Sequence, residues 1–213
     1  MWDPATGRMA HLLHVSSDNV WGVAFSPGGK LLASAGATVR LWDPATGKPI
    51  RTLPANNPHN ASFGVAFSPG GKLLAAAGSD GTVRLWDPAT GQQIRVLHAA
   101  STPNGVWGVA FSPNGRLLAS ANWDGTIRLW DPSTGQALGV PFGLVNAVSG
   151  VWGVAFSPDG RLLASADNAG TVRFWNVPAF VNPYAALCTD VGAPTQQEWN
   201  QNAAGEPQPS VCS

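Results

Sequence analysis

One phrase, Val-Ala-Phe-Ser-Pro, occurs four times along the chain, and this repetition constrains the fold more than any other feature. Its copies begin at Val23, Val65, Val109 and Val154, with spacings of 42, 44 and 45 residues. A second phrase, Trp-Asp-Pro, begins at Trp2, Trp42, Trp86 and Trp130, and a degenerate copy begins at Trp175. Residues 64–92 and 108–136 align without a gap and are identical at 22 of 29 positions. A period of this length predicts small stacked units that share one continuous core.

Each unit has the pattern of short β-strands separated by tight turns. In the first unit we expect strands over residues 20–26, 30–35, 38–42 and 49–53. Asn-Gly and Asp-Gly pairs in the later units supply the positive φ that tight hairpins need. The first unit is two residues shorter in one hairpin than the others, and a loss of two residues preserves which side chains face the core.

The units resemble the WD-repeat family, in which about 40–45 residues form each blade of a β-propeller. The resemblance covers residues 1–178, in units that end at Trp42, Trp86, Trp130 and Trp175. It implies an all-β fold, a β-propeller of four blades that each have four antiparallel strands, followed by an irregular C-terminal extension over residues 179–213. In this family the outer strand of one blade precedes the three inner strands of the next, so we expect an outer strand over residues 7–14.

The C-terminal extension resembles the segment that follows bacterial WD arrays attached to kinases or signalling NTPases. The matching features are Cys188, Glu198-Trp199, Gly205-Glu206-Pro207 and Cys212. This resemblance implies a role in bacterial signalling. A disulfide between Cys188 and Cys212 and a pair of free thiols both remain open, although a reducing cytoplasm disfavours the disulfide.

Many blades of the family carry a hydrogen-bonded set of His, Ser or Thr, Asp and Trp. The resemblance gives structural roles to Trp42, Trp86, Trp130, Trp175, Asp80 and Asp124. The hydroxyl is present as Ser34, Ser120 and Ser165, but the second unit has Ala76, and the His is absent from every unit. Because one buried hydrogen bond contributes only about 0.5–1.5 kcal/mol, we expect contacts between blades to specify the fold, chiefly through Val23, Phe25, Leu32, Leu41 and their repeats.

Composition and motifs argue against several classes of function. Twelve basic residues balance twelve acidic ones, which disfavours nucleic acid and anionic membranes as partners. No apolar run approaches the length of a membrane span, and the first residues do not have the pattern of a signal peptide, so we expect a cytoplasmic protein. The four His residues have no metal-ligand spacing, and no phosphate-binding loop is present. We therefore predict neither a catalytic site nor a cofactor.

The function that remains is a scaffold for protein–protein interaction, which presents one rigid face of the propeller to protein partners. A truncated fragment of a larger signalling protein, a kinase or NTPase with a C-terminal WD array, is the alternative, and a propeller enzyme is a weaker one. We predict that partners bind the aromatic residues at the start of the first strands and at one hairpin tip: Trp21, Phe63, Trp107, Trp123 and Trp152. The competing hypothesis is that these rings only fill space between blades.

Four blades are fewer than the usual ring of this family contains. We therefore expect either a homodimer that completes an eight-bladed ring or an open arc from a longer protein. The rival is a closed four-bladed monomer, in which residues 7–14 supply the outer strand of the last blade.

Overall fold

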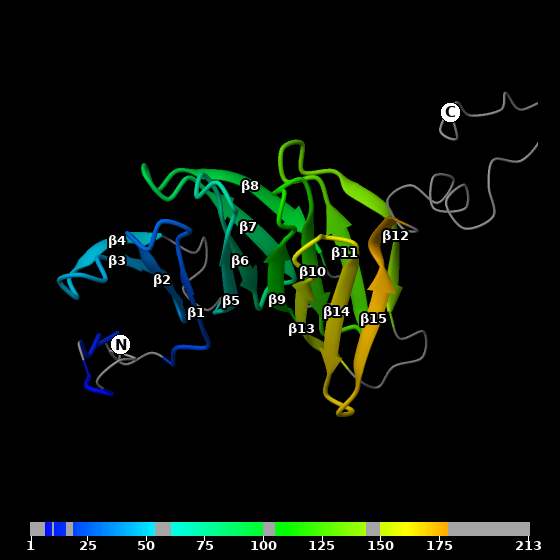
Figure 1. Ribbon diagram of the computed structural model, residues 1–213, viewed down its shortest axis with the longest axis horizontal. Helices are drawn as coiled ribbons and strands as arrows, with labels where there is room; N and C mark the ends of the chain where they lie inside the picture. The colour runs from blue at the N-terminus through cyan, green and yellow to red at the C-terminus, as the bar shows by residue number, and fades with distance from the viewer. Residues whose placement is uncertain are drawn as a thin grey trace, which may run out of the picture.

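The protein is an arc of four antiparallel β-sheets, which are the blades of a β-propeller (Figure 1). The computed structural model describes residues 7–9, 11–15, 19–53, 61–99, 105–143 and 150–178. All fifteen elements in this part of the chain are β-strands. The predicted all-β fold of WD-type blades is confirmed.

Successive strands pair with their neighbours in sequence, so each repeat folds into its own blade. Blade 1 contains β1 (Gly22–Phe25), β2 (Leu32–Ala35), β3 (Val39–Trp42) and β4 (Pro49–Leu53). Blade 2 contains β5 (Ser62–Phe67), β6 (Leu74–Gly78), β7 (Thr82–Trp86) and β8 (Gln93–His98). Blade 3 contains β9 (Val106–Phe111), β10 (Leu118–Asn122), β11 (Thr126–Trp130) and β12 (Ala137–Gly143). Blade 4 contains β13 (Val151–Phe156), β14 (Leu162–Asp167) and β15 (Val172–Asn176).

The shortened hairpin of the first unit leaves its strands in phase. Ala35 pairs with Val39 and Leu32 pairs with Trp42, as Ala77 pairs with Val83 and Leu74 with Trp86 in the second blade. The core side chains of blade 1 therefore keep the orientation of their repeats.

The blades pack face to face, and each joint repeats the same contacts. We call the face that touches the preceding blade the leading face and the face that touches the following blade the trailing face. The first joint contains Val65, Phe67, Leu74, Ala76 and Trp86 from the leading face of blade 2, and Ala33, Val39, Leu41 and Leu53 from the trailing face of blade 1. The equivalent residues fill the joints between blades 2 and 3 and between blades 3 and 4. The core therefore lies between the blades, as expected for stacked repeats.

The structure does not show the strand that we expected over residues 7–14. Residues 7–9 and 11–15 form no strand beyond an isolated bridge at Met9, and the described part of blade 4 has three strands instead of four. The segment lies over the leading face of blade 1, at the opposite end of the arc from β15 (Figure 1). It is paired with none of the described strands there, and a strand forms only where its backbone groups can pair.

The two ends of the arc expose the faces that every internal joint buries. Val23 and Phe25, which we expected to pack between blades, are 64% and 54% exposed, because no described blade precedes theirs. On the trailing face of blade 4, Val172 and Phe174 are 62% and 71% exposed. Their repeats in blade 3, Ile127 and Leu129, are buried.

Candidate partner-binding surface

Four aromatic rings that the repeat places at the start of the innermost strands stack in one row across the blades. The ring centroids of Phe63 and Trp107 are 4.4 Å apart with nearly parallel planes, and those of Trp107 and Trp152 are 5.6 Å apart, also stacked. Trp21 meets Phe63 edge to face at 5.8 Å. We call this set, together with Trp123, the aromatic row.

Trp123 joins the row from the hairpin between β10 and β11. Its ring lies 5.5 Å from that of Trp107, and its backbone N–H donates to the carbonyl of Gly105 at 3.1 Å. A Cβ on Gly150 would lie only 2.9–3.1 Å from the backbone and ring of Trp123, so this hairpin tip is packed against the start of blade 4. The structure thus brings together all five residues that the sequence predicted as a binding surface.

Both ends of the aromatic row face solvent. Trp21 is 53% exposed and Trp152 is 52% exposed, while Phe63, Trp107 and Trp123 are half-buried between them. The indole N–H of Trp107 is buried and has no hydrogen-bond partner among the described residues. Folding alone would favour a phenylalanine at this position, since an unsatisfied buried donor costs about 1–3 kcal/mol.

A glycine follows each aromatic residue of the innermost strands and sets how closely the blades approach. A Cβ on Gly22 would lie 2.8 Å from the carbonyl oxygen of Phe63, and one on Gly64 would lie 2.9 Å from that of Trp107. Gly108 meets the carbonyl of Trp152 in the same way, at 2.9 Å. The absence of a side chain therefore permits the contact between neighbouring inner strands. Sequence reasoning missed this role, although the aromatic-Gly pair recurs in all four units.

The tryptophans that end the repeats stabilise the blades from within. The indole N–H donates to a serine hydroxyl in three blades, at 2.9 Å from Trp42 to Ser34, 3.1 Å from Trp130 to Ser120 and 2.8 Å from Trp175 to Ser165. In blade 2 the indole N–H of Trp86 has no described partner, since Ala76 stands at the serine position.

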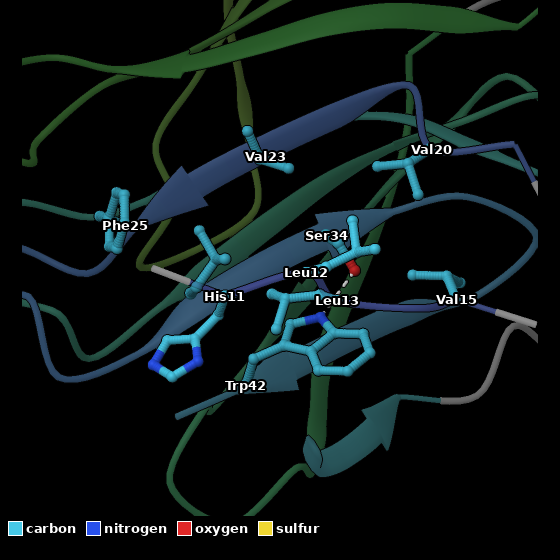
Figure 2. A pocket seen from close by; sticks show the side chains of 10 residues that line it. His11, Leu12, Leu13, Val15, Val20, Val23, Phe25, Ser34 and Trp42 are labelled. Carbon is cyan, nitrogen blue, oxygen red and sulfur yellow. Dashed lines mark hydrogen bonds between the residues drawn. The ribbon is translucent and has the colours of Figure 1, made fainter. Parts of the chain in front are cut away.

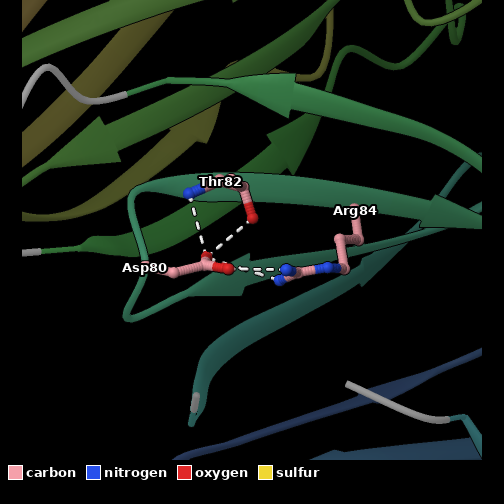
Figure 3. Close-up of polar contacts among 3 residues, drawn as sticks. All are labelled: Asp80, Thr82 and Arg84. Carbon is pink, nitrogen blue, oxygen red and sulfur yellow. Dashed lines mark hydrogen bonds and ion pairs between the residues drawn. The ribbon is translucent and has the colours of Figure 1, made fainter. Parts of the chain in front are cut away.

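The hairpin aspartates are held by short local contacts. Asp80 accepts hydrogen bonds from the backbone and hydroxyl of Thr82, and its other carboxylate oxygen pairs with the Arg84 guanidinium at 2.5 Å (Figure 3). Asp124 accepts from the backbone and hydroxyl of Thr126 at 3.0 and 2.5 Å. Burial raises the pKa of Asp80, but the bonds from Arg84 and Thr82 outweigh it and leave the pKa below its ordinary value.

In blade 4 a different residue accepts the hydrogen bonds of the hairpin backbone. Ala169 stands at the aspartate position, and Asp167, two residues earlier, accepts from the backbone N–H groups of Ala169 and Thr171 and pairs with Arg173. The Thr171 backbone bond is the main reason why the pKa of Asp167 lies below its ordinary value. Sequence reasoning overlooked this substitution because Asp167 does not align with Asp80 and Asp124.

Every carboxyl group with a resolved shift in the described ranges has a pKa below its ordinary value, because local hydrogen bonds stabilise the ionised form. In the same ranges no three His, Cys, Asp or Glu side chains are placed to hold a metal ion. No helix there is long and apolar enough to cross a membrane. The predictions for Cys188, Cys212 and the extension over residues 179–213 lie outside the described residues.

Comparison with known proteins agrees with the repeat structure. The model of the family "WD domain, G-beta repeat" matches residues 7–43, 47–87, 91–131 and 145–176, which is more than half of the chain. Striatin-4 of Homo sapiens is 42% identical over 62 residues, which cover 27% of this chain and 8% of that protein. Striatin-4 of Mus musculus matches to the same extent. The chain therefore spans only a small part of these relatives. With four family matches, each of which ends one residue after a repeat-ending tryptophan, the chain belongs to the WD-repeat family.

Proposed function

We propose that this protein is an interaction scaffold and that it binds its protein partners through the aromatic row. Repeats of this family serve as platforms for protein interaction, and the observation that singles out this surface is the set of five aromatic rings in mutual contact across three joints between blades. The partner is a protein segment that presents apolar or aromatic side chains to the row.

The physical properties of the row suit such a partner. Tryptophan is enriched among the residues that dominate binding energy at protein interfaces, and it orders few rotatable bonds when it binds. The row is already ordered by its own ring contacts, so a partner does not have to offset the cost of arranging it. The blades behind the row hold it in a fixed position, and such a rigid surface favours specific binding of one partner.

The competing hypothesis, that the rings only fill space, accounts less well for the ends of the row. Trp21 and Trp152 leave about half of their surface exposed and have no second layer of described residues over them. Trp123 occupies a hairpin position at which blade 2 folds with Ser79, so a tryptophan is not required for that hairpin.

The test is a binding experiment with a matched pair of variants. A displayed library of random peptides is selected against the immobilised chain, and the affinities of enriched peptides are measured by fluorescence anisotropy. Trp123→Ser, which installs the residue of blade 2, should raise the Kd about 30-fold, as expected for a residue worth about 2 kcal/mol at an interface. Val140→Ser, which changes a side chain 78% exposed on the outermost strand of blade 3, should leave the Kd unchanged.

Two results would contradict the proposal. One is selection of peptides whose affinity is the same for the Trp123→Ser variant and for the unchanged protein. The other is an equal loss of affinity in the Val140→Ser control, which would show that the peptides bind exposed apolar side chains without regard to the row.

A further inference from the structure

We propose that two copies of this chain join head to tail, with the trailing face of blade 4 in one copy packed on the leading face of blade 1 in the other. The first face presents Val172 and Phe174, and the second presents Val23 and Phe25, all more than half exposed. These are the same two kinds of face that meet at each of the three joints inside the chain. A second copy therefore offers each exposed face the partner for which its repeat pattern is built.

The shapes of the two faces are complementary. The surface of blade 4 has a hollow of about 270 Å³, lined by small residues that include Gly153, Ala155, Ala164 and Ala166. At the joint between blades 2 and 3, Val109 and Phe111 pack on the corresponding small residues Ala75 and Ala77. Val23 and Phe25 are the repeats of Val109 and Phe111, so they are the side chains that fit the hollow on the other copy.

Gly153 indicates independently that the trailing face of blade 4 is shaped to contact a further blade. Gly22, Gly64 and Gly108 each face a backbone carbonyl of the next blade so closely that a Cβ would meet it at 2.8–2.9 Å. Gly153 occupies the same position in blade 4, but a Cβ there would meet nothing within 4 Å. In the head-to-tail pair, the carbonyl of Trp21 in the other copy takes the place of the missing carbonyl. The joint would also extend the aromatic row from Trp152 to that Trp21.

Residues 11–15 already lie where the joint requires an outer strand. Arg51 and Arg95, on the outer strands of blades 1 and 2, donate to the carbonyls of Ala89 and Ser133 in the turn of the following blade. His11 contacts the carbonyl of Ala45 at 3.0 Å in the equivalent turn of blade 1. The segment thus stands in for the outer strand of a blade that would precede blade 1.

The side chains of this segment cover only part of the leading face. They line an apolar pocket of about 440 Å³ beside Trp42 and Ser34, and Val23 and Phe25 stand on its rim along β1 (Figure 2). Blade 4 of the other copy would pack its three strands over this pocket, and the unpaired edge of β15 would lie beside residues 11–15. By the register of blade 1, in which Val39 pairs with Leu53 and Leu41 with Arg51, Val172 would pair with Leu13 and Phe174 with His11 of the other copy.

Two such joints are related by a twofold axis and close the assembly. A head-to-tail contact makes a ring when its rotation closes, and a filament when it does not. Two arcs of four blades make eight, which lies within the usual range of 4–8 blades for propellers. Closure would bury both ends of each arc and leave no exposed terminal face.

The first test is the mass of the full 213-residue chain in solution, measured by light scattering after size-exclusion chromatography. The proposal predicts a single species at twice 22.1 kDa. A species of 22.1 kDa at micromolar concentration would overturn it, and so would an open-ended series of larger assemblies, since the two joints would then fail to close.

Three variants test whether the pair uses these faces. Gly153→Ala and Phe174→Ser should each weaken the pair at least about 100-fold and yield a monomer with the same far-ultraviolet circular dichroism, because both sites are open in the single chain. Gly70→Ala is the control: Gly70 lies in a turn with nothing within 4 Å of its Cβ position, and the pair should persist. A pair that survives Gly153→Ala would form through another surface and would refute the joint.

A cysteine pair tests the register of the joint. In a chain with Cys188→Ser and Cys212→Ser, the changes Leu13→Cys and Val172→Cys should produce a disulfide between copies under mild oxidation, since paired positions of adjacent strands have Cβ atoms about 4.5–5.5 Å apart. Either change alone should produce none. Equal crosslinking when Leu12→Cys replaces Leu13→Cys would contradict the register, because neighbouring residues point to opposite faces.

Discussion

Blade 2 lacks one hydrogen bond that the other three blades make, and restoring this bond should stabilise the protein. The indole N–H of Trp86 is buried without a described partner, and Ala76 stands at the position where the other blades have a serine whose oxygen accepts at 2.8–3.1 Å. Ala76 is 2% exposed, and the corresponding positions of blades 3 and 4 accommodate a buried serine, Ser120 and Ser165. Ala76→Ser should therefore supply the acceptor without a change of backbone.

The expected gain follows from two opposing terms. The unsatisfied indole N–H costs about 1–3 kcal/mol of stability, which the new hydrogen bond would restore. Burial of the serine hydroxyl offsets part of this gain, so the free energy of unfolding should rise by about 1 kcal/mol. For a chain of this size that corresponds to a rise in Tm of about 2–4 °C. Ser120→Ala is the reciprocal change in blade 3, and it should lower the free energy of unfolding by a similar or larger amount, since Ser120 is fully buried.

A double-mutant cycle separates the hydrogen bond from other effects of the serine. The free energy of unfolding is measured by urea titration with far-ultraviolet circular dichroism in the unchanged protein, Ala76→Ser, Trp86→Phe and the double variant. On the phenylalanine background the serine has no donor to accept from and should no longer stabilise. A gain that persists with Trp86→Phe, or a loss of stability in Ala76→Ser alone, would refute the reasoning.

Three further outcomes are expected. Gly108→Ala should destabilise the fold by about 1–3 kcal/mol in urea titration, because its Cβ would clash with a backbone carbonyl, while Gly70→Ala should stay within about 0.5 kcal/mol. Asp80→Asn should be less stable than the unchanged protein at pH 7. Because the folded pKa of Asp80 lies below 3.8, this difference should persist above that pH and disappear as the pH falls further, which thermal melts at several pH values will show. Trp123→Ser should cost about 0.5–1.5 kcal/mol through its lost ring contact, more than the 0.5 kcal/mol expected for an ordinary surface residue, and a cooperative melt will measure it.

The repeat predicted the blades well because it carries local information. Hairpin turns and strand alternation lie within one unit, so the two-residue deletion before Thr38 could be judged from the sequence alone. The serine partners of Trp42, Trp130 and Trp175 could be assigned in the same way.

Features that depend on contacts between units were predicted less well. Val23 and Phe25 carry the same local pattern as their buried repeats, but their burial depends on a neighbouring blade, which a single unit does not encode. The strand expected at residues 7–14 likewise depends on a neighbouring blade, because it needs the edge of another strand with which to pair. The members of the aromatic row could be found by alignment of the units. The contacts between their rings could not, because these depend on the close approach of the blades that Gly22, Gly64 and Gly108 allow.

The parallel stacking of Trp107 and Trp152 gives the protein a built-in optical signal. The two indoles belong to different blades, and their planes are only 12° apart at a centroid distance of 5.6 Å. Electronic transitions of two identical chromophores at this separation couple, which splits their ultraviolet absorption into two exciton bands with circular dichroism of opposite sign. Trp123 also lies 5.5 Å from Trp107 within blade 3, so the contribution of the Trp107–Trp152 pair, and not the whole signal, would be lost when blades 3 and 4 separate while each blade kept its own strands. Spectroscopy of the unmodified chain could thus follow the opening of a single joint without an attached label.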